Sequence, residues 1–219
     1  MHDVKAANAV PSLRYPALLL GAFALVWAVL AISPWYRQDW LLENVCVVLA
    51  LCVFVPGARR LRFSNGAYTL LFLFLCLHEI GAHYTYSQVP YDRAFQRLTG
   101  QSLNALLGLQ RNHYDRLVHF LFGLLLLPLA AELFRARAPA RGVWKFLLPV
   151  LFIESLSACF ELIEWLAASV FGGDLGQAYL GTQGDIWDAQ WDMLLALIGA
   201  SLTQCMLMVR GGAAPEPGR

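Results

Sequence analysis

The stretch LVHFLFGLLLLPLAAELF, from Leu117 to Phe134, is almost entirely apolar over 18 residues. A transmembrane helix needs about 20 mostly apolar residues to cross a hydrocarbon layer of about 30 Å, so the stretch predicts such a helix. Asp115 and Arg116 stand just before it, and His119 lies near its start. Ionisable groups are costly in a bilayer and usually face a protein interior or cavity. The start of this helix is therefore a candidate functional site.

Five further apolar stretches along the chain are also long enough, or nearly so, to cross a membrane. They predict spans at about Pro16–Ser33, Trp40–Pro56, Ala67–Tyr84, Trp144–Phe171 and Asp188–Val209. Of the 219 residues, 58% are hydrophobic and only 14% are charged, which indicates a membrane protein. We predict an all-α, polytopic fold: one domain over residues 1–210, a bundle of six transmembrane helices, and a disordered tail at residues 211–219.

The basic residues orient the predicted bundle in the membrane. With a cytoplasmic N-terminus, eleven of the sixteen Lys and Arg residues lie on the inner side. The positive-inside rule then places both termini in the cytoplasm. Between the third and fourth spans, Ser87–Gln110 mixes apolar and polar residues and predicts an interfacial helical segment on the outer face. In the second span, Glu43 and Asn44 are expected at the wet outer end.

Four polar patches fall at the outer ends of spans three to six in this topology. They are His78–His83, Arg111–His119, Glu161–Glu164 and Gly184–Asp192. Residues three or four apart share a helix face, so each span offers two ionisable groups on one side. His78 and His83 are five apart and do not share a face, which excludes an HExxH zinc-protease motif.

The patches hold many more carboxylates than arginines, and a bound cation would offset this surplus. We predict a divalent metal ion, namely zinc, manganese or iron. The candidate ligands are His83, His119, Glu164 and Asp188. The candidate catalytic carboxylates are Asp115, Glu161 and Asp192, and Arg116 is the candidate substrate-binding residue.

Structural roles compete with these assignments. Asp185 and Asp188 also suit the N-terminal cap of the sixth span, where an acid favours the helix dipole. Arg116 also suits an ion pair with Asp115 or Glu164 that would lock the bundle. For His83 and His119, the alternative is a hydrogen-bonded imidazole in the core. The five cysteines lie in apolar runs and are interpreted as small buried hydrophobic residues.

Four motifs together resemble the YjdF-type family of bacterial inner-membrane proteins. They are Gly81–Tyr86, Arg111–His119, Glu161–Trp165 and Leu180–Met193. That family is multi-spanning and has no established activity, so the resemblance implies an inner-membrane location and supports the motif residues without supplying a reaction. A weaker similarity to VanZ-like membrane proteins rests on the glutamate-bearing fifth span and the Asp188 helix start.

The leading functional hypothesis is a metal-dependent hydrolase or group transferase. It would act on a lipid or lipid-linked headgroup at the outer, periplasmic face. Membrane lipid is the expected partner. Nucleic acid is excluded because the net charge is only +1 and no basic stripe is present. The alternatives are an ion or proton transporter or binding protein that uses the same carboxylates, and a structural envelope protein. The oligomeric state stays open.

Overall fold

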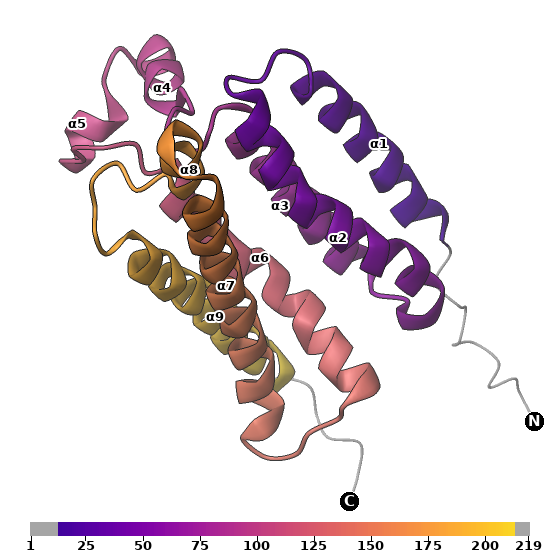
Figure 1. Cartoon of the computed structure of the whole chain (residues 1–219). Coiled ribbons are helices and arrows are strands. Elements are labelled where there is room, and N and C mark those ends of the chain that lie inside the picture. Colours follow the sequence, from indigo (N-terminus) through magenta and orange to yellow (C-terminus); the bar gives the residue numbers. More distant parts are fainter. Residues whose placement is uncertain (1–12, 213–219) are drawn as a thin grey trace, which may run out of the picture.

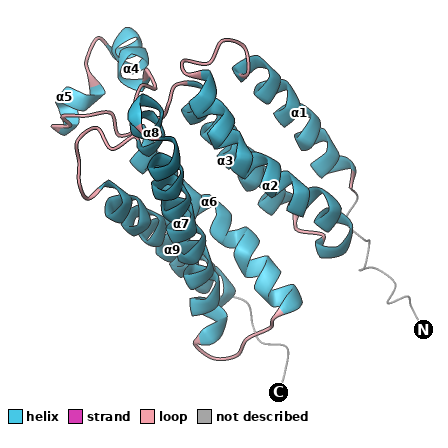
Figure 2. Ribbon diagram, in the orientation of Figure 1, coloured by secondary structure: helices cyan, strands magenta, loops and turns pink. Residues whose placement is uncertain are grey.

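The computed structural model describes residues 13–212, and within that range the chain forms helices joined by loops, without a β-strand (Figures 1 and 2). The helices are α1 (Arg14–Leu30), α2 (Arg37–Leu61), α3 (Asn65–His83), α4 (Tyr91–Thr99), α5 (Leu103–Leu107), α6 (Tyr114–Arg137), α7 (Trp144–Phe171), α8 (Gly173–Leu180) and α9 (Asp188–Gly212). The tail predicted to be disordered covers residues 211–219. Gly211 and Gly212 are the last two residues of α9, and residues 213–219 lie outside the described range.

Within residues 13–212, five helices are long and apolar enough to cross a membrane, namely α2, α3, α6, α7 and α9. The all-helical membrane class predicted from the sequence is therefore confirmed. Each of the six predicted stretches coincides with a helix, and α1 is the shorter apolar one with 17 residues. Prolines lie inside α2, α6 and α7, and transmembrane helices tolerate such residues where neighbouring groups satisfy the freed backbone.

The long helices form two groups, which Figure 1 shows as α1, α2 and α3 on one side and α6, α7 and α9 on the other. The most extensive helix–helix contact is that between α6 and α9, and α6 also packs against α3 and α7. The short helices α4, α5 and α8 all lie at one end of the bundle (Figure 1). The loops between the predicted spans three and four and between spans five and six thus meet at the same end.

Small residues let α6 and α9 approach until their backbones touch. A Cβ atom added at Gly123 would collide with the carbonyl oxygen of Ala196, and one added at Gly199 would collide with that of Phe120. The hydroxyl of Thr203 on α9 donates a hydrogen bond of 2.8 Å to the carbonyl of Leu124 on α6. Close packing through small residues is a common way for helices to associate in membranes. It brings the first turns of α6 and α9 together.

Two polar links join α3 to α6 at opposite ends of the bundle. Ser64 caps α3, and Glu132 on α6 accepts hydrogen bonds from the Ser64 backbone N–H (2.8 Å) and hydroxyl (2.5 Å). At the other end, the Tyr114 hydroxyl donates to the carbonyl of Leu77 at 2.8 Å. These links fix the position of α3 along α6, and with it the polar end of the bundle.

Candidate functional site

The candidate site centres on His119, Asp115 and Asp192, which are all buried. One ligand atom from each lies within 4.8 Å of those of the other two. Asp115 and His119 are one turn apart on α6, and His119 Nε2 lies 3.6 Å from Asp115 Oδ1. Ligand atoms of one tetrahedral zinc ion, each at about 2.0–2.2 Å from the metal, are about 3.3–3.6 Å apart. The three side chains would therefore have to approach one another by up to about 1 Å to hold one ion.

Helix α7 adds two carboxylates to the centre. Glu161 Oε1 lies 3.5 Å from His119 Nε2. Glu164, one turn further along α7, is also buried, and it is close enough to Glu161, Asp115 and Asp192 for their charges to interact. The structure thus brings together five of the eight residues proposed from the sequence, and they come from three different helices.

Arg111 and Arg116 form the edge of this cluster and bind the start of α9. Arg111 Nη2 lies 2.8 Å from Asp188 Oδ1, and Arg116 Nη2 lies 3.3 Å from the same oxygen. Arg116 also donates a 2.5 Å hydrogen bond to Asp185 Oδ2. Its guanidinium lies over the ring of Trp191, at 5.7 Å from the centroid. The ion pair of Arg116 with Asp115 or Glu164 considered above is therefore replaced by pairs with Asp185 and Asp188.

Asp188 joins the arginine edge to the carboxylate cluster. Its Oδ1 accepts a hydrogen bond from Arg116 and forms an ion pair with Arg111, whereas its buried Oδ2 has no hydrogen-bond partner among residues 13–212. One oxygen of this predicted ligand is therefore available to a ligand or ion. Asp192 lies one turn further along α9, and its Oδ1 is likewise buried without a hydrogen-bond partner in the described chain.

The loop before α9 is held by a charged hydrogen-bond network. Asp185 accepts a 2.9 Å hydrogen bond from the backbone N–H of Trp187. That bond and the bond from Arg116 stabilise the carboxylate and hold the pKa of Asp185 below its usual range. Arg111 also donates a 2.7 Å hydrogen bond to the carbonyl of Thr182. The two arginines thus hold the α8–α9 loop against the start of α6 and form one edge of the site.

His83 is not among the three residues whose ligand atoms lie within 4.8 Å of one another, and its side chain contacts a different part of the bundle. Its Nδ1 donates a 2.7 Å hydrogen bond to the carbonyl of Leu30 at the end of α1. The His83 carbonyl accepts a 2.8 Å hydrogen bond from the Trp35 backbone N–H. The last turn of α3 thus directs this side chain to the end of α1. Its observed role is that of a hydrogen-bonded imidazole that joins α3 to the α1–α2 connection.

A further set of buried carboxylates lies on α2 and α3, and sequence reasoning did not include it among the candidate site residues. Glu43 is only 2% exposed, although it was expected at a wet helix end, and Asp39 is equally buried. Glu79 on α3 is fully buried. Glu43 is close enough to Asp39, Glu79, Asp115 and Glu161 for their charges to interact. The four-residue spacing of Asp39 and Glu43 was the available signal, because it puts both on one face of α2.

His78 is a core residue that supports this second group. Its Nε2 donates to the Glu43 carbonyl at 3.3 Å, and its Nδ1 accepts from the Tyr86 hydroxyl at 2.5 Å. Gly81 makes room for Tyr86, since a Cβ atom there would lie 2.6 Å from the tyrosine ring. Both nitrogens of His78 are thus engaged in holding α2, α3 and the loop after α3 together.

This arrangement combines an imidazole and several carboxylates with two arginines at the rim. Buried carboxylate oxygens without a hydrogen-bond partner among residues 13–212 occur on Asp39, Glu43, Glu79, Glu154, Glu161, Asp188 and Asp192. Unpaired buried anions are strongly unfavourable, so a carboxylate in such a position is protonated, hydrated or neutralised by a cation or an arginine. Imidazole and carboxylate ligands suit zinc, manganese and iron, and arginines suit an anionic group of a substrate.

Comparisons with known proteins agree with the helical membrane architecture. Residues 15–212 match the model of a family described as "Predicted membrane protein (DUF2238)". The chain is also similar to the inner membrane protein YjdF of Escherichia coli strain K12, with 37% identity over 178 residues, or 80% of each chain. No solved structure matches the chain at a significant level.

Proposed function

The chain belongs to the DUF2238 family of membrane proteins, and from its buried cluster we propose that it is a metal-dependent enzyme acting on a lipid headgroup. The site would lie at the outer face of the inner membrane. The supporting observation is the group formed by His119, Asp115 and Asp192, whose ligand atoms lie within 4.8 Å of one another. Such a group is the ligand set that zinc, manganese or iron would use.

A six-span topology places this cluster at the periplasmic surface. The 17 residues of α1 extend over about 26 Å, which is close to the hydrocarbon thickness, so we include it as the first span. Nine of the fourteen Lys and Arg residues within residues 13–212 then lie on the cytoplasmic side, together with both termini. Helices α4 and α5 would form the interfacial segment, because Leu98, Leu106 and Leu107 are exposed there.

The chemical roles follow from position and charge. His119, Asp115 and Asp192 would hold the ion, with Asp188 contributing its unpaired oxygen. A bound ion would polarise a phosphoryl or carbonyl oxygen or activate a water molecule. Glu161, 3.5 Å from His119, is placed to exchange a proton with the nucleophile or leaving group. Arg111 and Arg116 would bind an anionic headgroup at the rim.

Metal analysis of the detergent-purified protein tests this proposal. After exposure to zinc, manganese or iron and removal of the excess, wild type should retain about one equivalent of one metal. His119→Ala and Asp192→Asn should each lose it. His83→Ala is the matched control, because it removes a histidine from the same end of the bundle that does not join the cluster, and it should retain the metal. Absence of metal from wild type, or equal metal in all four proteins, would overturn the proposal.

The carboxylates on α2 and α3 favour a second candidate function, the transport of a cation or proton. Asp39, Glu43 and Glu79 extend the buried acidic group from α6, α7 and α9 to the other half of the bundle. A transport path also needs polar groups through the full membrane thickness, whereas leucine and phenylalanine side chains predominate between α2, α3, α6 and α7 further along the helices. Ion-dependent flux in proteoliposomes, lost in Glu43→Gln, would establish transport.

A further inference from the structure

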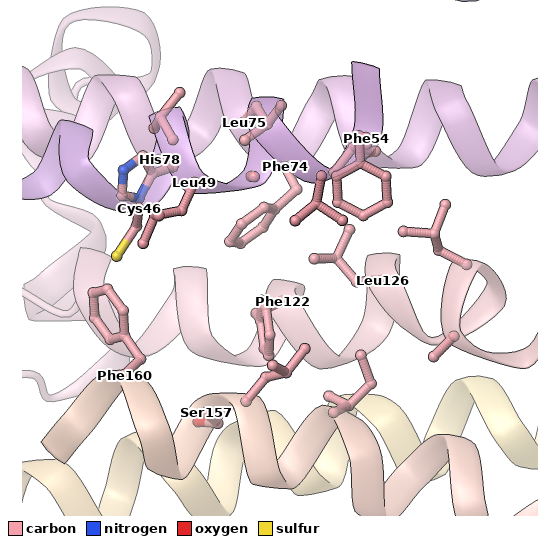
Figure 3. A pocket seen from close by; sticks show the side chains of 18 of the residues that line it. Cys46, Leu49, Phe54, Phe74, Leu75, His78, Phe122, Leu126, Ser157 and Phe160 are labelled. Atoms are coloured by element: carbon pink, nitrogen blue, oxygen red, sulfur yellow. The ribbon is translucent and has the colours of Figure 1, made fainter. Parts of the chain in front are cut away.

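A long apolar cavity of about 550 Å³ lies between α2, α3, α6 and α7 (Figure 3). Its volume falls within the range of about 300–1,000 Å³ that is usual for small-molecule sites. On α6, the lining side chains recur along one face; they are Val118, His119, Phe122, Leu126, Leu129, Ala130 and Leu133. The fourteen residue-to-residue steps from His119 to Leu133 correspond to about 21 Å along the helix axis. The cavity is therefore elongated along the bundle and lined almost entirely by apolar side chains.

One end of the cavity adjoins the proposed metal site. Figure 3 shows His78, Cys46 and Phe160 gathered at that end. His119 belongs to the same end, since its ring lies 5.8 Å from the ring of Phe160 and also lines the cavity. The Nε2 atom of His119 is meanwhile within 3.6 Å of Asp115 and Glu161. His119 thus lines the apolar cavity and also contacts the polar cluster.

The cavity also opens sideways, between α2 and α7. Three of its lining side chains are large, apolar and exposed: Leu49 (57%) and Val53 (63%) on α2, and Leu156 (42%) on α7. Helices α2 and α7 make hardly any direct contact with each other. In a membrane this side of the bundle faces lipid chains, so an acyl chain can enter laterally while its headgroup stays at the surface.

We propose that this cavity binds one acyl chain of a membrane phospholipid and places its phosphate at the His119 cluster. A phospholipid joins a long hydrocarbon chain to an anionic group, and the structure offers an apolar cavity that ends at His119, which belongs to a candidate metal site with two arginines at its edge. The inference rests on the proposed function and adds the substrate class. Small side chains along the channel, Ala50 on α2 and Ala130 on α6, set the space that the chain occupies.

Photo-crosslinking of the full-length protein tests the assignment. The probe is a phosphatidylglycerol with a diazirine at the end of one acyl chain, mixed into phosphatidylethanolamine vesicles that contain the protein. In wild type, the modified residues should lie on the cavity face, between Phe122 and Leu133. Ala50→Phe and Ala130→Phe each place a ring inside the channel and should reduce this labelling at least five-fold. The matched control, Ala28→Phe on the exposed face of α1, should not change it.

Metal content measured on the same samples separates this inference from the proposed function. The two channel variants should keep their metal and lose the chain label, whereas Asp192→Asn, whose side chain does not line the cavity, should lose metal and keep the label on the cavity face. Because Ala130 is buried and its variant could fold poorly, Ala50→Phe at a half-buried position provides an independent measurement. Labelling spread over the outer helix faces, labelling unchanged by both channel variants, or displacement by a polyprenyl phosphate alone would overturn the phospholipid assignment.

Discussion

Replacing Gly123 or Gly199 by alanine is expected to separate α6 from α9 and to weaken the candidate metal site. At each position the new methyl group would meet a backbone carbonyl of the other helix, so no flexible side chain can move aside. Overpacking of a close-packed interior usually costs about 1–3 kcal/mol, and a backbone obstacle places these changes at the upper end, about 2–3 kcal/mol. Gly123 lies one turn from His119, and Gly199 lies two turns from Asp192, so the separation should also lower metal retention.

The free energy of unfolding can be measured by titrating the purified protein from mild detergent into dodecyl sulfate and following helix content. Gly21→Ala is the control, because nothing lies within 4 Å of a Cβ atom there and a helical alanine is favoured over glycine by up to about 1 kcal/mol. The double variant Gly123→Ala/Gly199→Ala should cost less than the sum of the single changes, since both act on one interface. If Gly123→Ala were as stable as Gly21→Ala and kept its metal, the close approach of α6 and α9 would not be what forms the site.

Two further predictions concern polar contacts outside the cluster. The lowered pKa of Asp185 means that its carboxylate stabilises the fold fully above its unfolded-state pKa of about 3.9 and loses this effect as the pH falls through the lower folded-state pKa. Wild type should therefore lose thermal stability more steeply below about pH 4 than Asp185→Asn. The variant should already be less stable at pH 7, because its bond with Arg116 is weakened. Parallel curves of melting temperature against pH for the two proteins would contradict this. Glu132→Gln should lower the free energy of unfolding by about 1 kcal/mol, because it weakens two hydrogen bonds to Ser64. Ser64→Ala should cost less stability in the Glu132→Gln background than in wild type. Full additivity in this double-mutant cycle would show that the contact contributes nothing.

Much of the candidate site could be predicted because it depends on local helix geometry. Asp115 and His119 are four residues apart, as are Asp188 and Asp192, so each pair shares a face in any α-helix. The apolar stretches around them are long enough to indicate membrane helices without knowledge of their neighbours. These two facts were sufficient to propose the α6 and α9 residues, which the structure brings together.

Other residues were misplaced because a helix end in the sequence is not the edge of the buried region. Glu43 was expected in water near the start of the second span. However, α2 begins at Arg37, six residues before Glu43, and α8 packs against α2, so Glu43 lies inside the bundle. His83 has the same polar, helix-end setting as His119, but the rotation of α3 turns it to the Leu30 carbonyl. Neither the overlying helix nor the rotation is encoded in the spacing of nearby residues.

The sequence by itself determined the membrane class, the positions of the long helices and the pairing of charged residues along each one. Hydrophobicity and helical periodicity are local properties, so they can be evaluated one segment at a time. Only the tertiary structure decided which faces meet. The touching backbones at Gly123 and Gly199 join α6 to α9, whereas α2 and α7 stay apart and leave the apolar channel beside His119. Such contacts depend on the relative rotation and depth of helices that are distant in the chain, and no single segment specifies them.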